Sequence, residues 1–250
     1  MFGKRTEANV RNITLKLQHE KGTTVKANHR MVWAMAAVVL VGCARLMTAT
    51  ANKDITATTD ALLSEMKEHF GENQGRIKHT LAVYEYAEQI RQAEGGDILT
   101  VRAAAIYHDI GIPGAKRVHG SAAGKYQEIE GPPIAREILT KLGLEKSKVD
   151  HICRIIANHH TAHDEDTVAT IEFKIVWDAD ALVNLRRRRA NTSKEEFSRI
   201  IEQTFRTQRG LQLAKELYLT DTGKRTGSIS VQQAKRPKQK QQRYAVRRLF

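Results

Sequence analysis

The chain has 250 residues, of which 41% are hydrophobic and 28% are charged. This balance is typical of a globular protein with a real core, and it excludes fibrous, collagen-like and wholly disordered chains. Two cysteines, Cys43 and Cys153, are too few for a disulfide scaffold or for a zinc site built from thiolates. Any metal is therefore expected to bind to histidine and carboxylate side chains.

The formal net charge of +13 favours nucleic acid or an anionic membrane surface as a partner. The charge is concentrated at the two ends, however. Residues 1–52 carry a net +6 and residues 221–250 a net +8, whereas residues 53–220 carry −1. The basic ends predict a weak contact with an anionic surface, and the function of the central part has to be inferred from other features.

Residues 1–54 are expected to be a poorly structured leader. They contain an apolar run over residues 31–42, which is shorter than the roughly 20 residues that a bilayer-spanning helix needs. The end of this run, Leu40-Val41-Gly42-Cys43, resembles the cleavage box of bacterial lipoproteins. We expect a cytoplasmic protein, with a lipid-anchored or exported protein as the alternative if the box is genuine.

Residues 55–220 form one predicted all-α domain, a compact bundle of about seven to eight helices, because their apolar positions recur with helical spacing and nowhere alternate as in a sheet. Residues 114–130 are rich in glycine and are predicted to be a long loop. Residues 221–250 are rich in Gln, Lys and Arg, which predicts a disordered basic tail. The predicted helices cover residues 59–70, 74–93, 101–107, 132–142, 147–158, 167–189, a segment opening at 192–193, and 211–219.

Histidines and aspartates occur where four of these helices are predicted to be buried. A buried imidazole or carboxylate needs a partner, and several of them pointing inward from separate helices are what a metal site in a bundle core requires. The residues concerned are His79, the pair His108-Asp109, the pair His159-His160, and Asp178 and Asp180.

In this order the residues resemble the HD superfamily of metal-dependent phosphohydrolases. The stretch Ala103-Ala-Ala-Ile-Tyr-His-Asp-Ile-Gly111 is similar to the most recognisable segment of that family, and His79-Thr80 is similar to its first motif. The resemblance covers about residues 58–220. It implies a helical fold, hydrolysis of a phosphate ester, and one or two divalent ions such as Fe, Mn, Mg or Zn. It also implies a first ion on His79, His108, Asp109 and Asp180, with Asp109 as catalytic residue.

Two aspartates compete for the last ligand position of that set. Side chains two residues apart on a helix point about 200° from one another, so Asp178 and Asp180 cannot both bind the same ion. Asp180 matches the Ala-Asp context of the family better and is the predicted ligand. Asp178 is expected either to orient a ligand histidine or to lie on the helix surface.

A second ion is implied by the similarity of His159-His160 to the histidine pair of two-metal relatives. Those relatives have His-Gly-Pro between the His-Asp pair and the histidine pair, where this chain has Glu130-Gly131-Pro132. Glutamate is a competent oxygen ligand, so Glu130, His159 and His160 are the predicted second set, with Asp109 bridging both ions. The replacement of histidine leaves one or two ions open.

The glycine-rich segment after the His-Asp pair carries cations that are predicted to bind the phosphate of the substrate. These are Lys116, Arg117, His119 and Lys125. The run Arg186–Arg189 is predicted to be a solvated helix face. The expected substrate is a nucleotide or another small phosphorylated metabolite.

Four alternatives compete with this prediction, one of which is an oxygenase with a mixed-valent di-iron site, as some all-helical HD proteins are. A cyclic dinucleotide phosphodiesterase of the HD-GYP branch is the nearest alternative, but Thr161-Ala-His-Asp-Glu-Asp166 stands where that branch has Gly-Tyr-Pro. A nucleic-acid-binding module that uses the basic termini would lose binding when they are removed and would show steep salt dependence. A protein that retains the metal only for its fold would show no turnover.

Overall fold

The computed structural model describes residues 54–189 and 192–220, and these residues are helical without any strand. The all-α prediction is confirmed. Residues 54–70 are helical, and nine helices follow within the described residues: α2 (Gln74–Glu94), α3 (Ile98–Tyr107), α4 (Ile112–His119), α5 (Gly124–Lys141), α6 (Lys146–Asn158), α7 (Glu165–Ala169), α8 (Ile171–Arg189), α9 (Lys194–Thr204) and α10 (Gln208–Tyr218).

Side-chain caps explain where several helices begin. Asn73, Asp97, Ser193 and Thr207 each accept a hydrogen bond from a backbone N–H in the first turn of α2, α3, α9 and α10, respectively. The sequence predicted α2, α6 and the start of α9 within one or two residues. The predicted helix start at residue 59 is wrong, because the helix extends upstream to residue 54 and the Thr59 hydroxyl donates to the carbonyl of Ile55 within it.

The predicted loop over residues 114–130 is wrong. Pro113 lies in the first turn of α4, where its missing N–H costs nothing, and Gly120 ends the helix in a left-handed conformation. Helix α5 then begins at Gly124, so Pro132 and Pro133 lie in its interior instead of its first turn. Tertiary packing against α4 and α6 keeps α5 helical through the two prolines.

The predicted helix over residues 167–189 is divided into α7 and α8. Thr170 adopts an extended conformation between them, and its hydroxyl donates to the carbonyl of Thr167. Helix α4 was not predicted, and α7 was predicted only as the start of a longer helix. The lipoprotein-like box Leu40–Cys43 and the basic tail over residues 221–250 lie outside the described residues.

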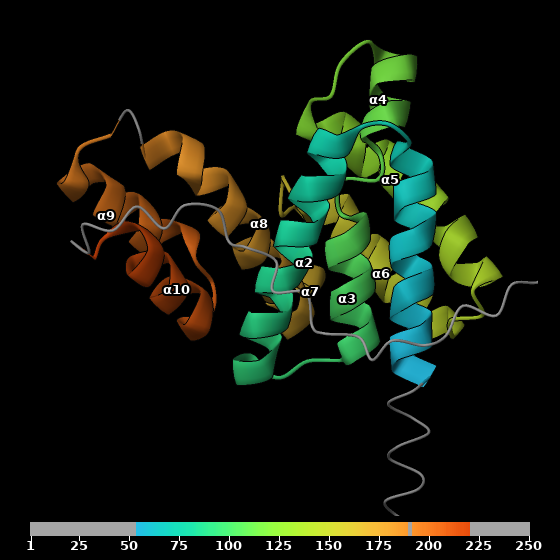
Figure 1. Cartoon of the computed structure of the whole chain (residues 1–250), viewed down its shortest axis with the longest axis horizontal. Coiled ribbons are helices and arrows are strands. Elements are labelled where there is room, and N and C mark those ends of the chain that lie inside the picture. Colours follow the sequence, from blue (N-terminus) through green and yellow to red (C-terminus); the bar gives the residue numbers. More distant parts are fainter. Residues whose placement is uncertain (1–53, 190–191, 221–250) are drawn as a thin grey trace, which may run out of the picture.

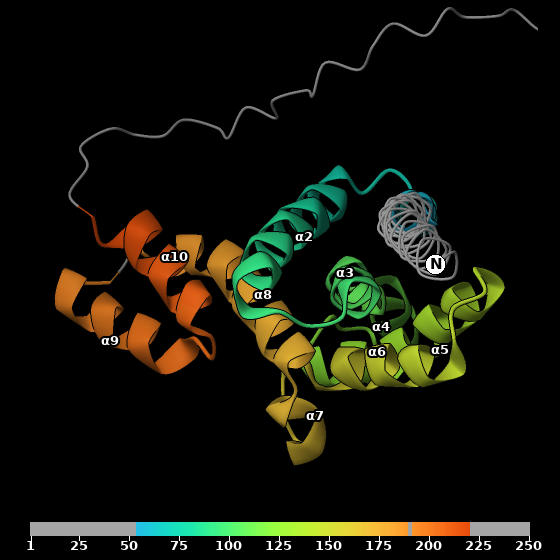
Figure 2. The same cartoon turned by 90° about the horizontal axis from the view of Figure 1, so that it is seen from below.

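Helix α3 forms the centre of the fold, with seven of its ten residues buried. It packs against α2, α6 and α8, and the Tyr107 hydroxyl donates to the carbonyl of Leu62 in the helix over residues 54–70. Figures 1 and 2 show α3 enclosed by these elements, with α9 and α10 gathered beyond α8. The C-terminal end of α3, where His108 and Asp109 follow, is consequently held deep inside the bundle.

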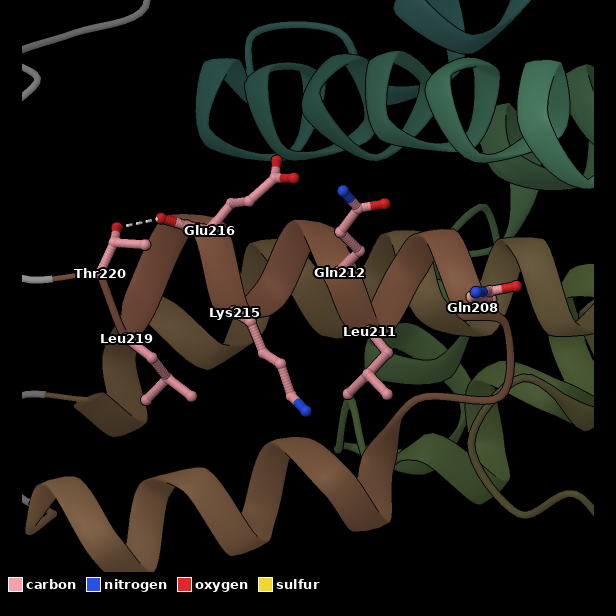
Figure 3. A pocket seen from close by; sticks show the side chains of 7 residues that line it. All are labelled: Gln208, Leu211, Gln212, Lys215, Glu216, Leu219 and Thr220. Carbon is pink, nitrogen blue, oxygen red and sulfur yellow. Dashed lines mark hydrogen bonds between the residues drawn. The ribbon is translucent and has the colours of Figure 1, made fainter.

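A separate hollow of about 570 Å³ lies along the outer side of α10. Figure 3 shows Leu211, Lys215 and Leu219 extending from one side of this helix. None of the predicted site residues lines this hollow.

Among the described helices, none combines the length and the apolar character that crossing a membrane requires.

Candidate metal centre

Three of the predicted ligands meet where α2 approaches the end of α3. Nε2 of His79 lies 3.2 Å from Nε2 of His108, and Oδ2 of Asp109 lies 3.4 Å and 3.5 Å, respectively, from these two nitrogens. One donor atom from each residue lies within 4.8 Å of the others. This spacing suits three ligands of a single ion, at about 2.0–2.2 Å from each donor.

Asp180 of α8 faces the same point. Its Oδ1 lies 3.1 Å from Nε2 of His79 and 3.5 Å from Nε2 of His108. Asn184, one turn further along α8, donates from Nδ2 to both carboxylate oxygens of Asp180 at 2.9 Å and fixes their orientation. The structure thus brings Asp180 to the histidines, as the choice between the two aspartates predicted.

Asp178 lies elsewhere, and neither role predicted for it fits the structure. It is fully buried and accepts hydrogen bonds from the backbone N–H groups of Arg206 and Thr207, both at 2.8 Å, and from the Thr207 hydroxyl at 2.7 Å. Its carboxylate therefore secures the segment that precedes α10. Burial raises the pKa of Asp178 to about 6, against the effect of these hydrogen bonds.

A second cluster shares Asp109 with the first. It contains His159 and His160 at the C-terminal end of α6, and one donor atom from each of the three residues lies within 4.8 Å of the others. Nε2 of His159 lies 3.9 Å from Oδ1 of Asp109, whereas Oδ2 of Asp109 faces the first cluster. Asp109 therefore presents one oxygen to each cluster, as expected of a bridging carboxylate.

The imidazoles of His108 and His159 are oriented as metal ligands. Nδ1 of His108 donates to the carbonyl of Ala105 at 2.8 Å, and Nδ1 of His159 donates to the carbonyl of Ile156 at 2.7 Å. Since a carbonyl can only accept, the proton lies on Nδ1 and the lone pair of Nε2 points into the cluster. Nε2 of His159 is buried and has no hydrogen-bond partner among the described residues. A buried nitrogen of this kind fits a metal ion.

The electrostatics of the site favour a positive charge at its centre. Burial opposes the charged form of His108, but the carboxylates of Asp109 and Asp180 outweigh it and raise its pKa to about 9. Burial and the neighbouring imidazoles of His160 and His108 lower the pKa of His159 to about 4. The two carboxyl groups have lowered pKa values despite their burial, because the surrounding histidines favour their ionised forms. A divalent ion would supply the same positive charge and displace the proton.

Glu130 does not join the second cluster. Its Oε1 lies 3.0 Å from Nε2 of His119, whose ring stacks on Tyr126 at a centroid distance of 4.3 Å. The α5 side chain that contacts the imidazole of His160 is Gln127, with Oε1 3.3 Å from Nε2 of His160. Nε2 of Gln127 donates to the carbonyl of Ala122 at 2.6 Å, so the amide oxygen is directed toward the histidine.

A pocket of about 300 Å³ opens onto both clusters. Its lining comes from α2 and its cap, α5, α8 and the turns that follow α3 and α6: Asn73, Gly75, Arg76, His79, Asp109, Gln127, His160, Asp180, Asn184 and Arg187. None of the four predicted phosphate-binding residues, Lys116, Arg117, His119 and Lys125, lines it. They lie at the end of α4 and in the first turns of α5.

The cations that do line the pocket are Arg76 and Arg187. The guanidinium group of Arg76 donates to Oδ2 of Asp109 at 2.9 Å, and the side chain remains 36% exposed. Helical spacing could have identified both residues. Arg76 precedes His79 by three residues and Arg187 follows Asp180 by seven, which places each on the same face as a predicted ligand.

The HD domain family matches residues 76–185 of this chain. Two solved structures are similar to it. The first, a predicted HD superfamily hydrolase from an uncultured Thermotogales bacterium, is 25% identical and has a TM-score of 0.48, with 63% of this chain and 83% of that chain covered. The second, an HD-superfamily hydrolase from Bacillus thuringiensis, is 20% identical and has a TM-score of 0.48, with coverage of 66% and 90%. The comparison with curated proteins gave no match.

Proposed function

We propose, from the premise that this chain is an HD-domain protein over residues 76–185, that it is a metal-dependent phosphohydrolase. It would cleave a monoester or diester of a small phosphorylated compound. The observation that carries this proposal is the pair of clusters joined through Asp109, with the imidazole nitrogens of His108 and His159 oriented into them. Such a site has histidine and carboxylate ligands on four helices and an adjoining pocket for a substrate.

The first ion would be held by His79, His108, Asp109 and Asp180. A divalent ion in this position would polarise a phosphoryl oxygen and would lower the pKa of a water molecule, so that the water could lose a proton and act as the hydroxide nucleophile. The chain contributes the orientation of the donors, through the backbone bond to His108 and the Asn184 bond to Asp180. His159 and His160 would hold a second ion with Asp109. Glu130 is not among its proposed ligands, because its carboxylate contacts His119 instead.

Arg76 would neutralise charge beside the reacting phosphate. Its guanidinium group contacts Oδ2 of Asp109, the oxygen that faces His79 and His108. The Arg76 side chain also lines the pocket that would receive the substrate, and its guanidinium group has N–H donors beyond the one that contacts Asp109. A guanidinium group matches phosphate oxygens in charge and geometry.

The test of this function uses the full chain and the variants His108→Ala and Asp109→Ala. Bound metal per chain and the hydrolysis of an aryl phosphate are measured together, after loading with Mn²⁺, Fe²⁺, Mg²⁺ or Zn²⁺. Both variants are expected to lose metal and activity, while His151→Ala, a histidine of α6 outside both clusters, should retain them. Full metal content and full activity in either site variant would refute the proposal.

A further inference from the structure

We infer that the pocket selects a small, strongly polar phosphate ester such as a sugar phosphate, bound through Arg76 and Arg187, and discriminates against nucleotides. This inference rests on the proposed phosphohydrolase function and concerns its substrate. The sequence predicted that Lys116, Arg117, His119 and Lys125 bind the phosphate and that nucleotides are among the substrates.

Two helix faces converge on the pocket. Asn73, which caps α2, is followed on the same face by Arg76 and His79 at intervals of three residues. On α8, Asn184 and Arg187 follow Asp180 after four and seven residues, again on one face. Helices α2 and α8 pack side by side, as Figures 1 and 2 both show. Each face therefore carries a metal ligand, an amide and an arginine to the same pocket.

The two arginines differ in their surroundings. Arg76 already bonds to Asp109. Arg187 is exposed and forms no ion pair with the described residues, although its side chain lines the pocket. A cation at the mouth of a metal site, without a carboxylate partner there, is suited to an anionic group of the substrate. Arg188, the next residue on α8, is equally exposed but does not line the pocket.

The wall of the pocket contains no Phe, Tyr, Trp or aliphatic side chain, and its rings are the imidazoles of the proposed ligands His79 and His160. Proteins commonly hold nucleobases by stacking them on aromatic or other flat side chains, and drug-sized ligands usually bind in pockets with an apolar lining. Its volume of about 300 Å³ lies at the lower end of the range for ligand pockets. The imidazoles of His79 and His160 are engaged as proposed metal ligands, and the lining offers no apolar wall against which a purine or pyrimidine ring would be buried.

The side-chain amides of Asn73 and Asn184 are part of the pocket lining. Asn184 uses Nδ2 to bind Asp180, which leaves its carbonyl oxygen as an acceptor. Asn73 uses Oδ1 to cap α2 at the N–H of Arg76, which leaves its NH₂ group as a donor. Hydroxyl groups both donate and accept, so a polyhydroxylated substrate satisfies both amides.

The substrate test compares ribose 5-phosphate with adenosine 5′-phosphate, which differ by the base. With metal-loaded full-length protein, kcat/KM for ribose 5-phosphate is expected to exceed that for adenosine 5′-phosphate by at least about tenfold. Equal values or a preference for the nucleotide would overturn the inference and leave the phosphohydrolase proposal intact. Absence of hydrolysis of both compounds and of an aryl phosphate would refute the function itself.

The residue test measures the binding of inorganic phosphate to metal-loaded protein by calorimetry, a readout that does not depend on turnover. Arg187→Ala is expected to weaken binding at least about tenfold, and Arg187→Lys should restore part of it because it keeps the charge. Metal content should not change. Arg188→Ala is the matched control, since it removes the same charge beside the pocket. An equal loss in Arg187→Ala and Arg188→Ala, or no loss in the former, would contradict a direct contact.

Discussion

The side-chain oxygen of Gln127 lies 3.3 Å from Nε2 of His160, and its amide nitrogen is held by the carbonyl of Ala122. An amide oxygen is thereby fixed beside the second cluster, whose other members are Asp109 and His159. A neutral amide is a weaker ligand for transition metals than an imidazole or a carboxylate. We therefore expect the second ion to bind less tightly than the first.

Replacing Gln127 with histidine should strengthen the second site. The imidazole offers a nitrogen ligand near the place where the amide oxygen lies, so the variant Gln127→His should approach two ions per chain at metal concentrations that give about one in the wild type. The measurement is metal content after equilibrium dialysis against graded Zn²⁺ or Mn²⁺. The matched variant Gln127→Ala should stay at one ion. Wild-type protein that already binds two ions with equal affinity would contradict the expectation.

The turn that carries the histidine pair depends on Glu128. This buried carboxylate accepts hydrogen bonds from the backbone N–H groups of His160 and Thr161, both at 2.9 Å, and from the Thr161 hydroxyl. The variant Glu128→Ala leaves these donors without a partner and should lower the free energy of unfolding by about 1–3 kcal/mol. It should also weaken binding of the second ion, because His160 is no longer held in place.

Two further variants separate this positioning role from metal binding. Glu128→Gln keeps an acceptor oxygen and should recover much of the stability, as measured by urea denaturation of metal-free protein. Glu130→Ala, which removes the carboxylate paired with His119, should leave the metal content unchanged. Loss of the second ion in Glu130→Ala but not in Glu128→Ala would reverse the assignment of the two glutamates.

The proposed ligands of the first site could be identified in the sequence because they are polar residues next to positions that the helical pattern predicts to be buried. His79 lies between the buried residues Ile77 and Val83 of α2, and His108 and Asp109 follow α3, in which seven of ten residues are buried. The choice of Asp180 over Asp178 came from the family resemblance. The role of Asp178 was not predictable, since its partners, Arg206 and Thr207, are 28 and 29 residues away in sequence.

The residues of α5 and the pocket cations were assigned less well. The glycines of residues 114–130 predicted a loop, so no helix face could be assigned there, and Glu130 was chosen only because Glu130-Gly131-Pro132 stands where two-metal relatives have His-Gly-Pro. Tertiary packing, which local preferences do not reveal, makes this segment helical. Arg187 was predicted to lie on a solvated helix face with the rest of Arg186–Arg189, and Arg76 was given no role, although both have helical spacing from the predicted ligands His79 and Asp180.

Gly111 allows α5 to approach the turn that follows the His-Asp pair. A Cβ atom at this position would lie 2.5 Å from the carbonyl oxygen of Gln127 and 2.6 Å from the nitrogen of Gly131, both backbone atoms. Since neither can move alone, Gly111→Ala should displace α5 and lower the free energy of unfolding by about 1–3 kcal/mol or more. Thermal denaturation of metal-free protein measures the effect.

Gly75→Ala is the matched control for this substitution. Its Cβ would meet only Oδ1 of Asn73, at an ordinary contact distance of 3.6 Å, and alanine is the better helix former by about 1 kcal/mol. This variant should be as stable as the wild type or more stable. A Gly111→Ala protein with unchanged stability would show that α4 and α5 do not need this close approach.

Asp178 should make the stability of the fold depend on pH in the mildly acidic range. Its pKa is about 6 in the folded protein, compared with the ordinary value of 3.8. Because the folded state binds this proton more tightly, the contribution of the group is fully present below about pH 4 and is lost as the pH rises through about 6. The difference corresponds to about 3 kcal/mol.

The variant Asp178→Asn isolates this contribution, because an amide does not titrate. Urea denaturation at pH 4, 5, 6 and 7, with EDTA present, should show that the wild type loses stability relative to the variant as the pH rises. The variant should nevertheless be less stable than the wild type at pH 4, since its NH₂ group faces the donors of Thr207. Glu137→Gln, at an exposed position of α5, should follow the wild type throughout. Parallel pH profiles of the wild type and Asp178→Asn would mean that Asp178 keeps an ordinary pKa, and that its three hydrogen bonds fully offset its burial.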